Sequence, residues 1–353
     1  MRLGQVSARF AYEPQLDGLR ACAVLAVIVH HAPTRVGEGG YIGVDVFFVL
    51  SGFLITTLLT RELAATGHVS FRDFYVRRIR RLGPALLAVT GAVVAVWLIV
   101  PTVSNRAGTL RGAPIALLYV SSWVAAFQTT SLGWFGHTWS LSVEEHFYLL
   151  WPLAFLALAR RSPRLLAWAT VGVAAASASE WYAGYARGWS NPRLFFAPDT
   201  RAKDILVGCL LAVLVDRAIV GRESLFNAAS IVAATILGSW ALVVPQDSVF
   251  YLLGWPLVLT AAAALIASCH LSPRSLVPRL LTHRWLVWIG VRSYAAYLIH
   301  FPVTALNGAV IHWQRGEKAA VFIVYVASTL ALADVCHRFI ESRFKRRSTL
   351  AAA

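Results

Sequence analysis

Long apolar runs separated by short charged segments make up most of the chain. Residues 224–246 and 248–273 contain no Asp, Glu, Lys or Arg. A helix needs about 20 apolar residues to cross a bilayer, so runs of this kind predict membrane-spanning helices. The candidate spans are residues 17–34, 41–60, 82–103, 141–159, 165–186, 203–219, 225–244, 248–271, 285–311 and 318–340. The pattern therefore predicts an all-α integral membrane protein with about ten transmembrane helices.

Two stretches fit this scheme less well than the others. The span at 203–219 is weak, because only eleven uncharged residues separate Asp204 from Asp216. The uncharged stretch 112–136 is long enough to cross, but it contains Pro114 and two glycines near its end. Proline and glycine disfavour a continuous helix. We therefore interpret 112–136 as an extracytoplasmic helix or a re-entrant segment.

The composition excludes two broad classes of protein. Only 14% of the residues are charged, 58% are hydrophobic, and the mean hydropathy is +0.63. Soluble domains carry about a quarter charged residues, and disordered chains have low hydrophobicity, so neither class fits. The four cysteines lie in or beside apolar runs and form no CxxC pair. We expect them to be packing residues, with no disulfide framework and no metal site.

The net charge of +15, from 32 Lys and Arg against 17 Asp and Glu, at first suggests a nucleic-acid partner. The positive-inside rule gives another explanation. With a cytoplasmic N-terminus, 22 of the 32 basic residues fall in cytoplasmic segments, nine fall in outer segments, and Arg292 lies within a span. The bias predicts that both termini are cytoplasmic, and we expect no nucleic-acid partner. An eleventh span at 112–136 would place the basic tail outside.

Arg20 and His31 stand out in the first span, because ionisable residues in membranes are functional candidates by default. They are eleven residues apart, so at 100° per residue they face the same side to within about 20°. Their separation along a helix axis is about 16 Å at 1.5 Å per residue. The alternative is that Arg20 extends its charged head to the interface and His31 is a hydrogen-bonded core histidine.

The segment FYVRRIRRLGP carries four arginines in five residues. Positive-inside anchoring explains part of this cluster. However, Arg78 and Arg81 are three residues apart and share a helix face. Because a guanidinium can bind two phosphate oxygens at once, such a pair on the cytoplasmic side is suited to a phosphate ligand.

Adjacent carboxylates, Glu144 and Glu145, open the span at 141–159 in HTWSLSVEEHFYLLWP. Aromatic anchoring at the interface would not need these acids, so we treat both as candidate site residues. Other polar positions in or beside spans are either functional groups or local hydrogen-bonding and packing residues. These positions are Asp17, Asp45, Ser51, Asp199, Arg201, Ser293, Tyr297 and His300.

Taken in order, these segments resemble the membrane-bound acyltransferase-3 family, which contains bacterial O-acetyltransferases of surface polysaccharides and relatives that acylate macrolides. The resemblance covers roughly residues 14–342. The segments that carry it are LDGLRACAVLAVIVHH, GYIGVDVFFVLSGFLIT, FYVRRIRRLGP, WSLSVEEHFYLLWP, DTRAKDILVGCLLA and SYAAYLIH. Each motif alone is weak, whereas six in the family order are specific.

The resemblance implies a multi-pass enzyme of the bacterial cytoplasmic (inner) membrane. It implies transfer of an acyl group, usually acetyl, from cytoplasmic acetyl-CoA to a hydroxyl of a surface or lipid-linked glycan, without a metal. We expect Arg20, Arg78 and Arg81 to bind the phosphates of acyl-CoA. His31 would act as general base or transient acyl carrier. Glu144 would orient a histidine or bind the acceptor, and it ranks above Glu145 because relatives keep an acid at the first position.

The domain expectation is a single acyltransferase unit over 1–353, without the C-terminal hydrolase-like domain that some family members carry. Transfer would then be direct or would pass to a separate extracytoplasmic transferase. Three alternatives stay open from the sequence. The acceptor could be a secreted small molecule such as a macrolide. The chain could be a secondary transporter, although no pair of related halves is visible. It could also be a scaffolding membrane protein, which would leave the Arg20–His31 alignment unexplained.

Overall fold

The computed structural model describes residues 12–32, 37–99, 105–215, 223–243, 254–310 and 318–344, except for the side chains of 307–310 and 318. Within these residues the protein is all-α and contains no strand. The helices are α1 Pro14–His30, α2 Ile42–Thr66, α3 Phe71–Ile99, α4 Arg106–Leu117, α5 Ser121–Phe127, α6 Trp139–Ala159, α7 Pro163–Ala186, α8 Asn191–Phe196, α9 Pro198–Val215, α10 Glu223–Val243, α11 Trp255–Leu271, α12 Leu276–Leu281, α13 Arg284–Val291, α14 Ser293–Val310 and α15 Lys318–Cys336. Short 3₁₀ helices lie at η1 Glu38–Tyr41 and η2 Gly133–Thr138, and a π-helical turn, η4, spans His337–Glu341.

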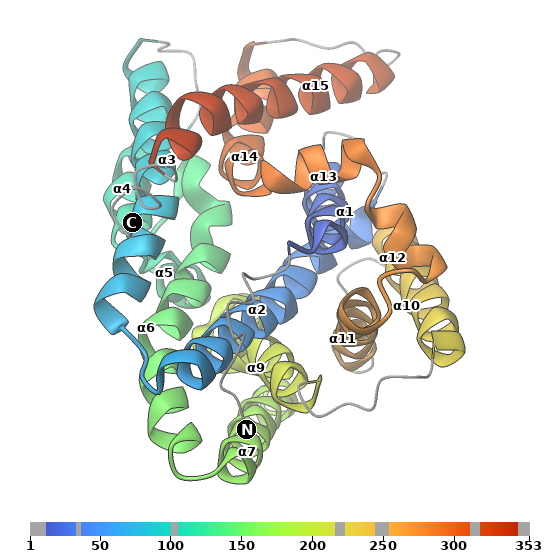
Figure 1. Ribbon diagram of the computed structural model, residues 1–353. Helices are drawn as coiled ribbons and strands as arrows, with labels where there is room; N and C mark the ends of the chain where they lie inside the picture. Colours follow the sequence, from blue (N-terminus) through green and yellow to red (C-terminus); the bar gives the residue numbers. More distant parts are fainter. Residues whose placement is uncertain are drawn as a thin grey trace.

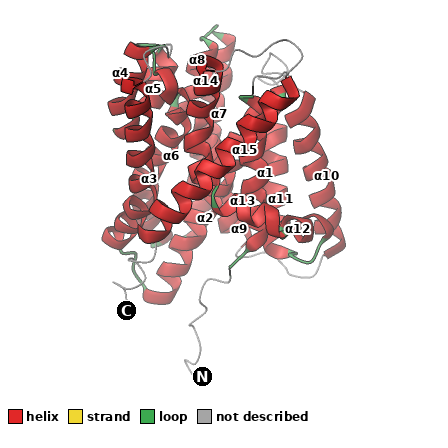
Figure 2. Ribbon diagram, turned by 90° about the horizontal axis from the view of Figure 1, so that it is seen from above, coloured by secondary structure: helices red, strands yellow, loops and turns green. Residues whose placement is uncertain are grey.

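The long helices form a bundle around α2. Figure 1 shows α2 near the centre of the molecule, with α6 on one side and α9 and α11 on the other, and with α15 lying across the top of the view. In Figure 2 most of the long helices run in roughly the same direction, and α15 is tilted across them. The short helices α4, α5 and α8 gather at one end of the bundle, and α12 lies at the opposite end.

Each predicted span overlaps one long helix or the α13–α14 pair. Among the described residues, four helices are long and apolar enough to cross a membrane, or five if the bent α13–α14 pair counts as one span. Helix α1 has only 17 residues, and α9 carries four charged residues in its first half. The structure therefore supports a membrane protein with several apolar helices, while ten crossings and two cytoplasmic ends stay predictions.

The stretch 112–136 is not one continuous helix. It is divided among α4, α5 and η2, and Pro114 lies inside α4. Two residues between these elements, Tyr119 and Gln128, have positive φ angles of 54° and 51°, and Gln128 ends α5 in the left-handed conformation. Backbone of this kind breaks a helix. The local structure agrees with an interrupted segment and disfavours an eleventh straight span.

Two glycines bring α2 and α9 into backbone contact. A Cβ on Gly52 would lie 1.9 Å from the Ile205 carbonyl oxygen, and one on Gly208 would lie 1.9 Å from the Val49 carbonyl oxygen. Only glycine fits at such a crossing, and small residues commonly permit close helix packing in membranes. The contact fixes α2 against α9 and leaves the opposite face of α2 toward α3, α6 and α14, where the candidate site lies.

Candidate active site

A pocket runs along one face of α2, and we call it the α2 slot. The helix contributes seven side chains at three- and four-residue spacing, the pattern of a single helix face. These are Val44, Phe47, Phe48, Ser51, Leu54, Ile55 and Leu58. The other walls come from α1, α3, α6 and α14, through Arg20, Arg78, Arg81, Leu82, Ser140, Leu141, Glu144, Tyr148, Ser293, Tyr294 and Tyr297. From Val44 to Leu58 the slot follows fourteen residues of helix, or about 21 Å.

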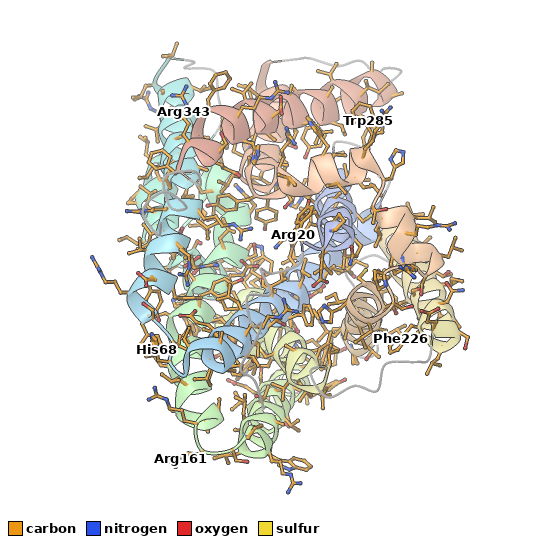
Figure 3. All side chains as sticks on the ribbon, viewed as in Figure 1. Arg20, His68, Arg161, Phe226, Trp285 and Arg343 are labelled. Carbon is orange, nitrogen blue, oxygen red and sulfur yellow. The ribbon has the colours of Figure 1, made fainter. Side chains whose placement is uncertain are left out.

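One end of the slot opens into a second pocket rich in arginine, which we call the basic pocket. The two pockets share Arg20, Arg78 and Arg81, together with residues of α2 and α14. The basic pocket adds Arg77 and Arg80 to this group. Figure 3 shows the labelled Arg20 toward the middle of the molecule, whereas the labelled Arg161, Trp285 and Arg343 lie at its edge. Five guanidinium groups thus lie at the slot mouth, and a concentration of positive charge attracts anions.

Two acidic residues, Asp17 and Glu341, also line the basic pocket. Arg20 donates to Asp17 Oδ1 at 2.7 Å, so this arginine is partly neutralised. The Tyr12 hydroxyl donates to Asp17 Oδ2 at 2.7 Å. Burial, together with this hydrogen bond to the carboxylate, raises the pKa of Tyr12 to about 12. Arg20 therefore faces the pocket as part of a Tyr12–Asp17–Arg20 chain and not as an isolated cation.

Arg78 and the two predicted carboxylates form one ionic cluster. Arg78 donates to Glu145 Oε1 from Nε at 2.9 Å and from a terminal nitrogen at 2.7 Å. The same guanidinium lies 3.9 Å from Glu144 Oε2 and stacks 3.2 Å above the centre of the Tyr148 ring. Arg78 is thus neutralised within the protein, which leaves it less charge for a phosphate than the sequence pattern alone suggests.

Arg81 lies in different surroundings. It lines both the slot and the basic pocket. Across the part of the chain that the structure describes, no carboxylate lies within salt-bridge distance of its guanidinium, and Arg80 shares this property. A phosphate group entering the basic pocket would therefore meet two guanidinium groups, at Arg80 and Arg81, that form no salt bridge within the described residues. Arg80 was not singled out by the sequence pattern.

Glu144 is paired inside the slot with a hydroxyl. Ser51 donates from Oγ to Glu144 Oε1 at 3.0 Å, and these two residues are 93 positions apart in the chain. Both line the slot. The two contacts of Glu144 are thus to a serine and to Arg78, and neither is to a histidine. The structure brings together Ser51, Glu144 and Arg78, which lie in three separate sequence motifs.

His31 lies beyond the slot, at the C-cap of α1. Its Nδ1 is 2.9 Å from the Val27 carbonyl oxygen. Since a carbonyl oxygen can only accept, Nδ1 carries the proton and Nε2 has a free lone pair. The His31 ring contacts the rings of His30, His300 and Phe301 at centroid distances of 4.9, 5.0 and 5.3 Å. His31 therefore presents Nε2 within an aromatic and histidine cluster.

The cluster contains a histidine that the sequence analysis did not select. His137 in η2 is buried, and its ring lies 5.2 Å from His300 and 5.7 Å from Tyr297. Among the residues that the structure describes, neither of its ring nitrogens has a hydrogen-bond partner, and neither does Nε2 of the buried His300. The sequence feature that could have identified His137 is its position three residues before Ser140, in HTWSLS. Buried imidazole nitrogens without partners favour a polar ligand or a proton path here.

Tyr297 joins the slot to the histidine cluster. Its hydroxyl donates to the His137 carbonyl oxygen at 2.9 Å and is 2.5 Å from Ser140 Oγ, which therefore donates to Tyr297. Its ring faces Phe47 at 6.4 Å and His300 at 5.3 Å. Ser140 and Tyr297 line the end of the slot away from the basic pocket. The order from one side to the other is basic pocket, α2 slot, Tyr297 and then histidines.

Three other predicted site residues lie outside the series of basic pocket, α2 slot and histidine cluster. Arg201 is buried between Asp45 at 2.5 Å and Asp204 at 3.0 Å, and Lys203 lies 3.1 Å from the same Asp204. Asp199 instead binds Arg193, with two hydrogen bonds of 2.8 and 2.6 Å. Asp45, Asp199 and Arg201 thus stabilise the contacts of α9 with its neighbours and do not line the slot. Within the described residues, no group of three or more metal-ligating side chains is present.

Comparison with known proteins gives the family. The acyltransferase domain model matches residues 13–338. The chain is 33% identical over 353 residues to the peptidoglycan O-acetyltransferase OatA of Listeria monocytogenes, covering 95% of this chain and 56% of that protein. It is 35% identical over 349 residues to the putative peptidoglycan O-acetyltransferase YrhL of Bacillus subtilis, covering 94% and 54%. The O-acetyltransferase OatA of Staphylococcus aureus is 32% identical over 360 residues, covering 97% and 58%.

The chain spans a little more than half the length of these relatives. No solved structure matches it significantly. The family match covers nearly all of the helices that build the basic pocket, the slot and the histidine cluster. This chain therefore belongs to the acyltransferase family defined by that domain.

Proposed function

We propose that the protein is a bacterial cytoplasmic-membrane enzyme that transfers an acetyl group from cytoplasmic acetyl-CoA to a hydroxyl of peptidoglycan or a related surface glycan. The observation that carries this proposal is the continuous order of basic pocket, apolar slot and histidine cluster. The relatives named above are O-acetyltransferases, two of them of peptidoglycan by name.

The donor fits this order by chemistry. The phosphates of acetyl-CoA would bind Arg80 and Arg81, which have no carboxylate partner among the described residues. The pantetheine arm would extend along the slot, whose α2 wall consists mainly of Phe, Leu and Ile side chains. The slot follows about 21 Å of α2, which exceeds the roughly 16 Å between Arg20 and His31 along α1, a distance comparable to an extended pantetheine arm. The slot is thus long enough for the arm to leave the phosphates in the basic pocket.

The acceptor would enter from the histidine side. His31 offers Nε2 as a base for the acceptor hydroxyl, because Nδ1 is held by the Val27 carbonyl. The buried nitrogens of His137 and His300 lie next to His31 and would carry the proton onward. The proposal places the basic pocket on the cytoplasmic side and the histidines toward the outer side, as the distribution of arginines predicts.

Reconstitution in proteoliposomes tests the function. The protein is supplied with acetyl-CoA on the cytoplasmic side and with a muropeptide on the other, and both free thiol and acetylated muropeptide are measured. We expect release of one thiol for each acetyl ester formed. Uptake of a solute without consumption of acetyl-CoA would instead indicate a transporter. Transfer that requires an added membrane extract would place a separate extracytoplasmic transferase after this chain.

A further inference from the structure

Ser51 is the one hydroxyl in the slot wall that donates to a carboxylate, within the residues the structure describes. It lies seven residues from Val44 and seven from Leu58, so about 10 Å of helix separates it from either end of the slot. A donor arm that enters from the basic pocket must pass Ser51 before it reaches Tyr297. The serine is therefore within reach of a thioester held in the slot.

The carboxylate beside Ser51 is held in position to receive a proton. Glu144 accepts from Ser51 through Oε1, while its other oxygen, Oε2, faces Arg78 at 3.9 Å. Arg78 is itself fixed by two hydrogen bonds to Glu145 and by stacking on Tyr148. A nucleophile with its base in hydrogen-bond contact, and the base oriented by a third group, is the arrangement that activates serine.

Ser140 and Tyr297, the hydroxyls at the far end of the slot, lack this arrangement among the described residues. Ser140 donates to Tyr297, whose own proton goes to a backbone carbonyl, so no base is in contact with it. His31 does not line the slot, and the Tyr297 and His300 rings lie between the slot and His31. A thioester in the slot would therefore meet Ser51 without direct contact with the proposed base, which favours a carrier between donor and acceptor.

We propose that Ser51 accepts the acyl group and that the reaction passes through an acyl-Ser51 ester. This inference rests on the proposed function, which supplies the acetyl-CoA donor. In the first step Ser51 Oγ forms a bond to the thioester carbonyl carbon, the carbon–sulfur bond breaks, and the Oγ proton moves to Glu144. The CoA thiolate leaves and takes a proton from solvent. The serine ester then holds the acyl group in the slot.

In the second step the acceptor oxygen forms a bond to the ester carbonyl carbon, and the bond from that carbon to Ser51 Oγ breaks. Glu144 returns its proton to Ser51 Oγ, and the proton of the acceptor passes through His300, whose ring lies between the slot and His31, to His31 and then to solvent. Atoms and charges balance over the two steps. The scheme assigns separate tasks to the two bases, since Glu144 acts in both half-reactions and His31 acts only in the second.

Loading without an acceptor tests the proposal. The full chain in nanodiscs is incubated with radiolabelled acetyl-CoA, digested, and analysed by mass spectrometry for an acetyl ester on the peptide that contains Ser51. We expect labelling of Ser51 in the wild type and greater accumulation in His31→Ala, which loads but does not unload. Glu144→Gln should load at least about 100-fold more slowly, the usual contribution of a general base. Ser51→Ala should abolish the label.

Two further variants separate chemistry from folding. Ser51→Cys keeps a nucleophile of similar size, so we expect a thioester on Cys that neutral hydroxylamine cleaves. Thr57→Ala removes a hydroxyl from the same helix that does not line the slot, and it should load normally. Acetyl transfer to the muropeptide with no label on Ser51, or with Ser51→Ala retaining half of the wild-type rate, would overturn the carrier role. Absence of transfer and of thiol release in the wild type would refute the proposed function itself.

Discussion

Arg78 and Arg81 lie one turn apart on α3 and line the same slot, yet only Arg78 has carboxylate partners. Arg78 is bound to Glu145 and faces Glu144, whereas Arg81 has no carboxylate within salt-bridge distance across the described residues. Two arginines that look equivalent in the sequence thus have different roles in the structure. One organises the carboxylates of the slot, and the other is open to an anionic ligand.

Replacing Arg81 with Ala should weaken binding of acetyl-CoA with little change in kcat. Loss of a charged hydrogen bond costs about 1.5–3 kcal/mol, which corresponds to an increase of roughly 10- to 100-fold in KM for acetyl-CoA. Arg78→Ala should instead lower kcat, because it releases Glu144 and Glu145. Steady-state kinetics in proteoliposomes distinguish the two effects. Arg72→Ala, an exposed arginine of α3 outside both pockets, is the control. Equal effects of the Arg78 and Arg81 variants would contradict this division.

Replacing His31 with Ala should strongly reduce acetyl transfer while leaving the binding of acetyl-CoA intact. General-base catalysis contributes about 10²–10⁴-fold, so kcat should fall by that range while donor affinity stays unchanged. Donor affinity can be measured by isothermal titration with desulfo-CoA, which is not turned over. His31 does not line the slot, which is why binding should be preserved. Normal turnover by correctly inserted His31→Ala protein would remove His31 from the mechanism.

The two adjacent glutamates should differ in their effects. Glu144 contacts Ser51 and lines the slot, whereas Glu145 contacts Arg78 and does not line it. Glu144→Gln should therefore lower kcat by about 100-fold or more, as loss of a proton acceptor does. Glu145→Gln should produce a smaller loss through displacement of Arg78. The same transfer assay measures both variants, and a larger defect for Glu145→Gln would exchange their roles.

The positions of the helices could be predicted from the sequence, because hydrophobic runs of helical length depend only on local composition. Each predicted span overlaps a long helix or the bent α13–α14 pair. The bend of 72° between α13 and α14 was not predicted. The same local reasoning aligned Arg20 and His31 on one face of the first helix, and of these two the slot is lined by Arg20 alone. His31 lies at the end of α1, beyond Tyr297, so a shared helix face did not mean a shared cavity.

Contacts between distant segments could not be predicted in this way. Ser51 and Glu144 are 93 residues apart, and Arg78 and Glu145 are 67 apart. Periodicity gives the face of one helix, but not which helix packs against it or at what register. His137 was missed for the same reason, since its importance comes from His300 and Tyr297, on a distant helix. Asp45 and Arg201 stood out in the sequence as clearly as the polar residues that line the slot. In the structure they form a buried ion pair away from the slot.

The crossing of α2 and α9 should depend on Gly52 and Gly208. A methyl group at Gly208 would overlap the Val49 carbonyl, so Gly208→Ala should destabilise the protein by about 1–3 kcal/mol, as overpacking does. Thermal unfolding in detergent, followed by tryptophan fluorescence, would show a lower Tm. Gly172→Ala in α7 is a matched control, because no atom lies within 4 Å of its added Cβ. Equal Tm values for the two variants would show that the crossing is not tight.

The ion cluster of Asp45, Arg201 and Asp204 should contribute to stability and not to catalysis. Removing one partner of a buried pair leaves an uncompensated charge and costs about 3–5 kcal/mol. Asp45→Asn should therefore lower Tm strongly, because Arg201 is only 2% exposed and the pair lies at 2.5 Å. Asp199→Asn, which affects a pair nearer the surface, should lower Tm less. Per folded molecule, Asp45→Asn should retain its KM for acetyl-CoA, since Asp45 does not line the slot. A stable Asp45→Asn protein with impaired transfer would instead move this cluster into the catalytic site.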